Sequence, residues 1–164
     1  MERDLPKVWA QRGAGYSFFA FVCLALGTTI GRAEPLDLSG LHGRVVYLDF
    51  WASWCAPCRQ SFPWMDSLQQ TYGAQGLSVL AINVDHDRAD AERFLKQFQP
   101  RFEVRFDPEG SWAQQFKVTG MPTSLIIDRR GVVRFTHVGF WPAESAVAAH
   151  EIRELLAEQV GEPQ

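Results

Sequence analysis

Metal-ligating residues are scarce in this sequence. Its 164 residues include three cysteines and four histidines, and no two of the histidines form an H-x3-5-H pair. A structural zinc site needs four ligands at short, regular spacings. Two of the cysteines form a single Cys-x-x-Cys pair, and the third, Cys23, lies apart in an apolar N-terminal stretch, where we interpret it as a filler residue. The sequence therefore argues against structural zinc, and we assign no metal ligands.

Basic segments are lacking as well. Lys and Arg number 16 against 19 Asp and Glu, the formal net charge is −3, and no run of basic residues occurs. Nucleic-acid-binding proteins usually carry a positive surface that meets the phosphates, so we expect no nucleic-acid partner. Apolar residues are plentiful: 46% of the chain is hydrophobic and 13% is aromatic, which is enough for one domain with a well-packed core.

The apolar run near the N-terminus is too short for a typical membrane span. Residues 1–33 combine early basic residues, a dense apolar stretch over 18–26 and small residues before Glu34, which is the layout of a cleaved signal peptide. The alternative is an uncleaved membrane anchor, although the apolar run over 16–27 is shorter than the ~20 residues that a spanning helix needs. Either interpretation exports the domain over 34–164, to the periplasm or another extracytoplasmic compartment.

The Cys-x-x-Cys pair lies in Trp54-Cys55-Ala56-Pro57-Cys58. The preceding residues, 45–51, form an apolar run that predicts a buried strand, and residues 59–72 have the pattern of a helix. Two cysteines at this spacing can close a small disulfide ring, and a strand-to-helix junction is where dithiol redox sites occur. A permanent structural disulfide is the alternative, but a loop this small would add little stability.

The position of Cys55 explains its expected reactivity. A thiolate attacks a disulfide whereas a thiol does not, and the unpaired N–H groups and dipole at a helix N-terminus favour negative charge. A cysteine with a pKa of ~8.5 is roughly 3% ionised at pH 7; a pKa of ~7 makes it about half ionised, a change of about 2 kcal/mol. Cys58, one turn further along, is expected to be less exposed and to resolve the mixed disulfide formed at Cys55. Pro57 suits a first helical turn.

The rest of the chain alternates between strand and helix patterns. Pro63 is expected to kink the first helix, a complete break there being the alternative, and Ser111 is expected to cap the third. Alternating elements predict an α/β fold with a central mixed β-sheet flanked by helices, to which a terminal hairpin adds antiparallel strands. The predicted strands are 45–51, 77–84, 104–106, 123–128 and 132–138, and the predicted helices are 59–72, 87–99, 111–116 and 143–160.

Three motifs together resemble a known family. They are the segment from Asp49 to Cys58, then Pro63, then Gly120-Met121-Pro122-Thr123. Over about residues 36–160 the chain resembles a thioredoxin-like fold, and more narrowly the exported TlpA/ResA-like thiol-disulfide oxidoreductases.

The resemblance implies a role for each matched residue. It makes Cys55 the nucleophile, Cys58 the resolving cysteine and Pro122 a cis-proline that faces the dithiol. The backbone of Met121 would then pair with a client segment as an added strand. Trp54 is expected to be a surface ring beside Cys55 that contacts partners.

Asp49 lies in the middle of an apolar strand, where a carboxylate is costly unless it is neutral or paired. One interpretation is a polar group that reaches water at the strand end. The other is a buried acid beneath Cys58, with a raised pKa, that accepts the proton of Cys58. Thioredoxins have an aspartate here, but the lysine that accompanies it in them corresponds to Ala81. Many TlpA/ResA-like proteins have a glutamate where this chain has Ser61, so that glutamate's role is not transferred.

These observations predict a monomeric, exported protein that reduces protein disulfides through Cys55 and Cys58. No cofactor is required, because the two sulfurs carry the two electrons. A reductant outside the cytoplasm implies a membrane electron donor of DsbD/CcdA type. The client stays open and includes proteins of cytochrome c biogenesis. The alternatives are a thioredoxin-fold peroxidase and a non-enzymatic copper-binding assembly protein that uses the two cysteines and His137.

Overall fold

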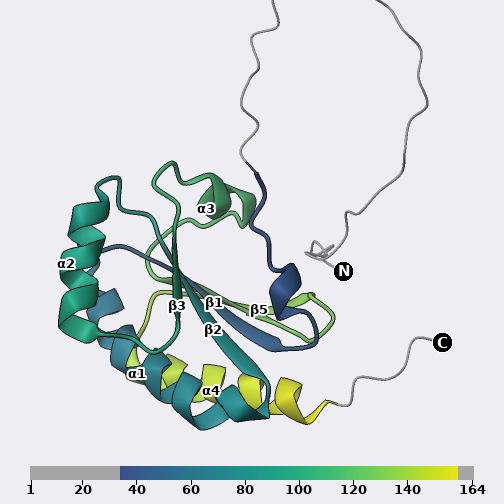
Figure 1. Ribbon diagram of the computed structural model, residues 1–164. Coiled ribbons are helices and arrows are strands. Elements are labelled where there is room, and N and C mark those ends of the chain that lie inside the picture. Colours follow the sequence, from purple (N-terminus) through teal and green to yellow (C-terminus); the bar gives the residue numbers. More distant parts are fainter. Residues whose placement is uncertain (1–33, 159–164) are drawn as a thin grey trace, which may run out of the picture.

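The computed structural model describes residues 34–158, which form one five-stranded sheet with the spatial order β3-β2-β1-β4-β5 (Figure 1). β1 pairs in parallel with β2, and β2 with β3, whereas β4 runs antiparallel to both β1 and β5. The predicted mixed sheet and the α/β class are therefore confirmed. The strands are β1 (Val45–Trp51), β2 (Leu77–Asn83), β3 (Glu103–Phe106), β4 (Thr123–Ile127) and β5 (Val133–Val138).

Helices cover both faces of this sheet. Figure 1 shows α1 and α4 beneath the sheet and α3 on the opposite side. Side chains of α1, α2 and α4 pack into one core layer, and those around α3 join the segment before β1 in the other. The helices are α1 (Ala56–Tyr72), α2 (Arg88–Phe98), α3 (Ser111–Gln115) and α4 (Pro142–Ala157), with 3-10 turns at Ser39–Leu41 and Gly73–Gln75.

The central strand β1 is buried along its whole length. Side chains in a strand alternate between the two faces of a sheet. Val45, Tyr47 and Trp51 accordingly belong to the core layer on the α1 side, and Val46, Leu48 and Phe50 belong to the layer on the α3 side. By this alternation Asp49 faces the same layer as the two cysteines, although it lies near the middle of the strand.

The helix that carries the dithiol differs from its predicted bounds. α1 begins at Ala56, three residues before the predicted start, because Cys55 serves as its N-cap and Pro57 fits its first turn. The helix continues through Pro63 to Tyr72, so the alternative of a break at that proline is wrong. Its inner face carries the buried side chains of Phe62, Met65 and Leu68.

Two other expectations about helix ends need correction. Ser111 is the first residue of α3 and does not cap it; the carboxylate of Asp107 accepts the Trp112 and Ala113 N–H groups at 3.0 and 2.9 Å. An aspartate one turn ahead of the helix reaches these free donors more readily than a residue inside it. α4 ends at Ala157, short of the predicted residue 160, and residues 159–160 lie outside the described range.

The predicted signal peptide or anchor at residues 1–33, with Cys23, lies outside the described residues. Within residues 34–158, no helix combines the length and apolar character needed to cross a bilayer.

Candidate active site

Cys55 and Cys58 are joined in a disulfide at the start of α1, with an S–S distance of 2.10 Å. Cys55 is 4% exposed and Cys58 is fully buried, in the order of accessibility that the sequence predicted. The N–H of Cys58 donates to Sγ of Cys55 at 3.2 Å. The first turn of the helix therefore directs a backbone N–H at the outer sulfur, which is the arrangement that favours a thiolate when the disulfide is reduced.

The two tryptophans near the dithiol lie in different environments. Trp51 is fully buried, with its ring 4.6 Å from that of Phe62 and 4.7 Å from that of Phe94, measured between centroids. Trp54 is 71% exposed and immediately precedes Cys55. Trp51 thus belongs to the core, and the expectation of a surface Trp54 is confirmed. The exposed aromatic ring is carried by the residue that precedes Cys55 in the sequence.

The peptide bond between Met121 and Pro122 is cis, as the resemblance implied. Thr123, the next residue, pairs with Phe50 near the end of β1. Because β4 runs antiparallel to β1, the start of β4 and the end of β1 share one edge of the sheet, and the cis-proline therefore lies at the same edge as the dithiol. The loop is held from β5, since Gly139 N–H donates to the carbonyl of Pro122 at 2.7 Å.

Asp49 is 1% exposed, and its Oδ2 atom has no hydrogen-bond partner. Burial raises the pKa of this carboxyl well above its ordinary value, because the charged form is poorly solvated. The interpretation that Asp49 reaches water at the strand end is therefore wrong. Its neighbours in the paired strands are Ala81 of β2 and Ser124 of β4, so neither strand places a positive charge beside it.

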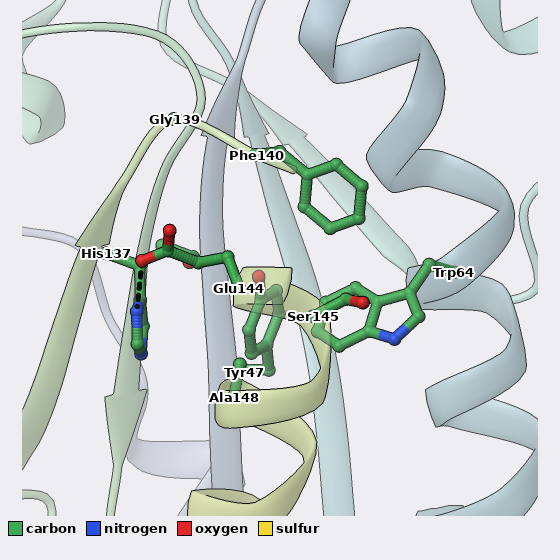
Figure 2. A pocket seen from close by; sticks show the side chains of 9 residues that line it. Tyr47, Trp64, His137, Gly139, Phe140, Glu144, Ser145 and Ala148 are labelled. Carbon is green, nitrogen blue, oxygen red and sulfur yellow. Dashed lines mark hydrogen bonds and ion pairs between the residues drawn. The ribbon is translucent and has the colours of Figure 1, made fainter. Parts of the chain in front are cut away.

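His137, the histidine of the copper alternative, pairs with Ser124 across the hairpin. Its Nδ1 lies 3.0 Å from Glu144 and its Nε2 lies 2.7 Å from Glu151. Figure 2 shows this histidine with Glu144 at a small pocket that Tyr47 also lines. Both ring nitrogens are engaged by carboxylates, and the described part of the chain gathers no cluster of three or more ligating side chains able to hold a metal ion.

Two polar residues around the site were missed or undervalued from the sequence. Asp85, just beyond β2, is buried and accepts hydrogen bonds from Ser53 and Asn83. The position of this aspartate directly after a central strand could have indicated a role, because active sites of α/β proteins lie at the carboxyl ends of the strands. Ser61 is fully buried, and its hydroxyl donates to the carbonyl of Cys58 at 3.1 Å.

A five-stranded mixed sheet, a disulfide at a helix N-terminus and a cis-proline at the same sheet edge together define a thioredoxin-fold protein with a dithiol-disulfide site. The Redoxin family model matches residues 23–152. The chain belongs to the Redoxin family and, within it, to the ResA-like thiol-disulfide oxidoreductases.

Individual relatives agree with this assignment. The chain is 34% identical over 118 residues to the thiol-disulfide oxidoreductase ResA of Geobacillus kaustophilus, covering 68% of each chain. A Chlorobium tepidum crystal structure described as a thiol:disulfide interchange protein DsbE is 50% identical, with a TM-score of 0.73, and the match covers 74% of this chain and 86% of that one.

A second structure, the exposed lipoprotein thioredoxin Etrx1 of Streptococcus pneumoniae, is 30% identical with a TM-score of 0.62, covering 71% of this chain and 89% of its own. The chain spans 59% of the length of the Bacillus thuringiensis ResA, which it matches at 33% identity.

Proposed function

We propose that the protein is an exported thiol-disulfide oxidoreductase that reduces disulfides in client proteins. The observation that carries this proposal is the Cys55–Cys58 disulfide at the N-terminus of α1, where the Cys58 N–H meets the outer sulfur at 3.2 Å. The ResA relatives, which are named as thiol-disulfide oxidoreductases, support the same activity. The disulfide is the oxidised end of the cycle, and the dithiol is the form that acts on clients.

The cycle follows from the two sulfurs. In the reduced protein the Cys55 thiolate attacks one sulfur of a client disulfide, whose S–S bond breaks and whose other sulfur leaves as a thiolate. Cys58 then loses its proton and attacks Sγ of Cys55, which breaks the mixed disulfide and frees the second client sulfur. Two electrons pass to the client, the protein becomes the Cys55–Cys58 disulfide, and the two client thiolates take up protons.

Asp49 is the proposed acceptor of the Cys58 proton. It faces the core layer that contains Cys58, and burial raises the pKa of Asp49 well above its ordinary value, which makes the carboxylate a better proton acceptor. Its Oδ2 atom has no partner and is free to take a proton. Since Ala81 stands where thioredoxins carry lysine, the affinity of Asp49 for a proton is determined by burial rather than by a neighbouring cation.

The client surface would consist of Trp54 and the cis-proline loop. An extended client segment would pair with the backbone of Met121 beside Pro122, and the exposed Trp54 ring would contact the residues around the client cysteine.

The proposed direction of electron flow is towards the client, and the proposed compartment lies outside the cytoplasm. Residues 1–33 are proposed to export the chain as a signal peptide or an anchor, and the exposed lipoprotein Etrx1 is a relative at 30% identity. Outside the cytoplasm, a monomeric reductant needs electrons from a membrane donor of DsbD/CcdA type. Pro57 and Asp49, both shared with thioredoxins, favour the reducing direction.

The reduction potential of the full chain tests the direction. Equilibration of the Cys55/Cys58 couple against glutathione and dithiothreitol buffers should return a value closer to about −270 mV than to about −120 mV. A value near the second figure would make the protein an oxidant. Turnover of a protein disulfide with dithiothreitol as electron source tests the activity itself, and faster turnover of hydrogen peroxide than of that disulfide would favour the peroxidase alternative.

A further inference from the structure

A buried carboxylate holds the turn that precedes the dithiol. Asp85 is 5% exposed. Its Oδ2 accepts the backbone N–H of Ser53 at 2.9 Å and an amide N–H of Asn83 at 2.7 Å, and its Oδ1 accepts the hydroxyl of Ser53 at 3.0 Å. Hydrogen bonds to an ionised acceptor are about twice as strong as neutral ones, so Ser53 is tied to Asp85 through both its backbone and its side chain.

Ser53 occupies a specific place in the turn that it stabilises. The N–H of Cys55 donates to the carbonyl of Ala52 at 3.2 Å, which closes a tight turn between β1 and α1. Ser53 is the second residue of this turn, and Cys55 is the last. Because Cys55 is also the N-cap of α1, the turn determines where Sγ stands relative to the N–H of Cys58.

The anchor on the other side is rigid. Asn83 is fully buried at the end of β2, and its Oδ1 accepts the N–H of Asp85 at 3.1 Å. The N–H of Val84 donates to the carbonyl of Trp51 at 3.0 Å, which joins this segment to the end of β1. Asp85 is thus fixed relative to the two central parallel strands, and its hydrogen bonds to Ser53 fix the turn relative to the same strands.

We propose that Asp85 is a positioning residue for Cys55: by holding Ser53 it keeps the Cys55 sulfur in line with the free N–H groups of α1, and so maintains the fraction of Cys55 that is thiolate. This inference rests on the proposed function, in which that thiolate attacks the client. Asp85 has two opposing effects. Its negative charge disfavours a nearby thiolate, whereas its hydrogen bonds to Ser53 hold the turn in a geometry that favours one, and the second effect is the larger.

The variant Asp85→Asn separates these effects by sign. The amide keeps the shape of the side chain, but its NH₂ group cannot accept the hydrogen bonds that Ser53 and Asn83 donate to the carboxylate. We therefore expect the turn to loosen. Alkylation of the reduced full chain by iodoacetamide, followed from pH 5 to 9 by mass spectrometry of the Cys55 peptide, reports the thiolate fraction. The midpoint of the pH dependence should rise by about half a pH unit. At pH values below the midpoint, the alkylation rate should then fall about threefold. A lowered or unchanged midpoint would overturn the proposal.

Two further variants serve as controls. Asp107→Asn removes another buried carboxylate that caps α3 rather than the dithiol turn, and it should leave the midpoint unchanged; an equal rise would mean that the effect of Asp85→Asn is general loosening. Ser53→Ala removes only the hydroxyl bond to Asp85 and should shift the midpoint in the same direction by less, and it replaces Asp85→Asn if that variant does not fold. A wild-type midpoint as high as that of a cysteine in a short peptide would instead refute the proposed function.

Discussion

Asp49 and Ala81 stand side by side in the paired parallel strands β1 and β2. One is a buried acid with an unpartnered oxygen, and the other is the methyl side chain in the position of the thioredoxin lysine. The acid is therefore surrounded by apolar and neutral groups, and its protonation is governed by desolvation. This pairing of an acid with a methyl side chain distinguishes the site from that of thioredoxins.

Replacing Cys58 by serine should trap the client. Without the resolving sulfur, the mixed disulfide at Cys55 has no internal thiol to break it, so Cys58→Ser should accumulate covalent complexes that dithiothreitol releases. Cys55→Ser is the matched control and should form none, because Cys58 is fully buried. Non-reducing gels followed by mass spectrometry would count and identify the adducts. Comparable trapping by Cys55→Ser would assign the nucleophile to Cys58.

Asp49→Asn should slow resolution more than the first attack. The amide cannot accept the Cys58 proton, and loss of a general base costs on the order of 100-fold or more in the step that it serves. Stopped-flow mixing of the reduced protein with a disulfide peptide separates formation of the mixed disulfide from its decay. The decay phase should carry most of the loss. Equal slowing of both phases would count against the role of Asp49 as a base.

The same variant should change how stability depends on pH. Burial raises the pKa of Asp49 in the folded chain above its unfolded value of ~3.9. The folded state therefore binds the proton more tightly, and the stability contributed at low pH is lost as pH rises from about 4 through the folded pKa. Urea unfolding of the oxidised protein between pH 4 and 8 should find that Asp49→Asn gains stability relative to wild type as pH rises. A constant difference would indicate that Asp49 is not held neutral.

Trp54→Ala should weaken client binding without weakening the fold. The ring is 71% exposed, and substitutions at such surface sites usually change stability by no more than about 0.5 kcal/mol. The KM for a protein disulfide should rise several-fold, whereas the rate of Cys55 alkylation by iodoacetamide should stay the same. The control is Val147→Ala, which changes an exposed apolar residue in a different element, α4. An unchanged KM would remove Trp54 from the client surface.

The strand and helix order was predictable because it is encoded locally. The apolar run of β1 and the spacing of Phe62, Met65 and Leu68 each depend on residues a few positions apart. Helix ends were less predictable, because caps depend on which side chain reaches a free N–H. Asp107, four residues before Ser111, accepts the N–H hydrogen bonds of α3 that had been expected to go to Ser111.

The dithiol was visible from the sequence alone, since the Cys-x-x-Cys spacing and the following helix pattern already place two sulfurs at a helix N-terminus. Only the tertiary structure decided what surrounds them: the seclusion of Asp49 from water, the engagement of His137 by two glutamates, and the hold of Asp85 on Ser53. Ser53 and Asp85 are 32 residues apart in the chain, and parallel pairing of β1 with β2 brings their ends together. Spacing along a chain specifies a local turn, but the solvation and partners of a side chain depend on segments that meet only when the sheet assembles.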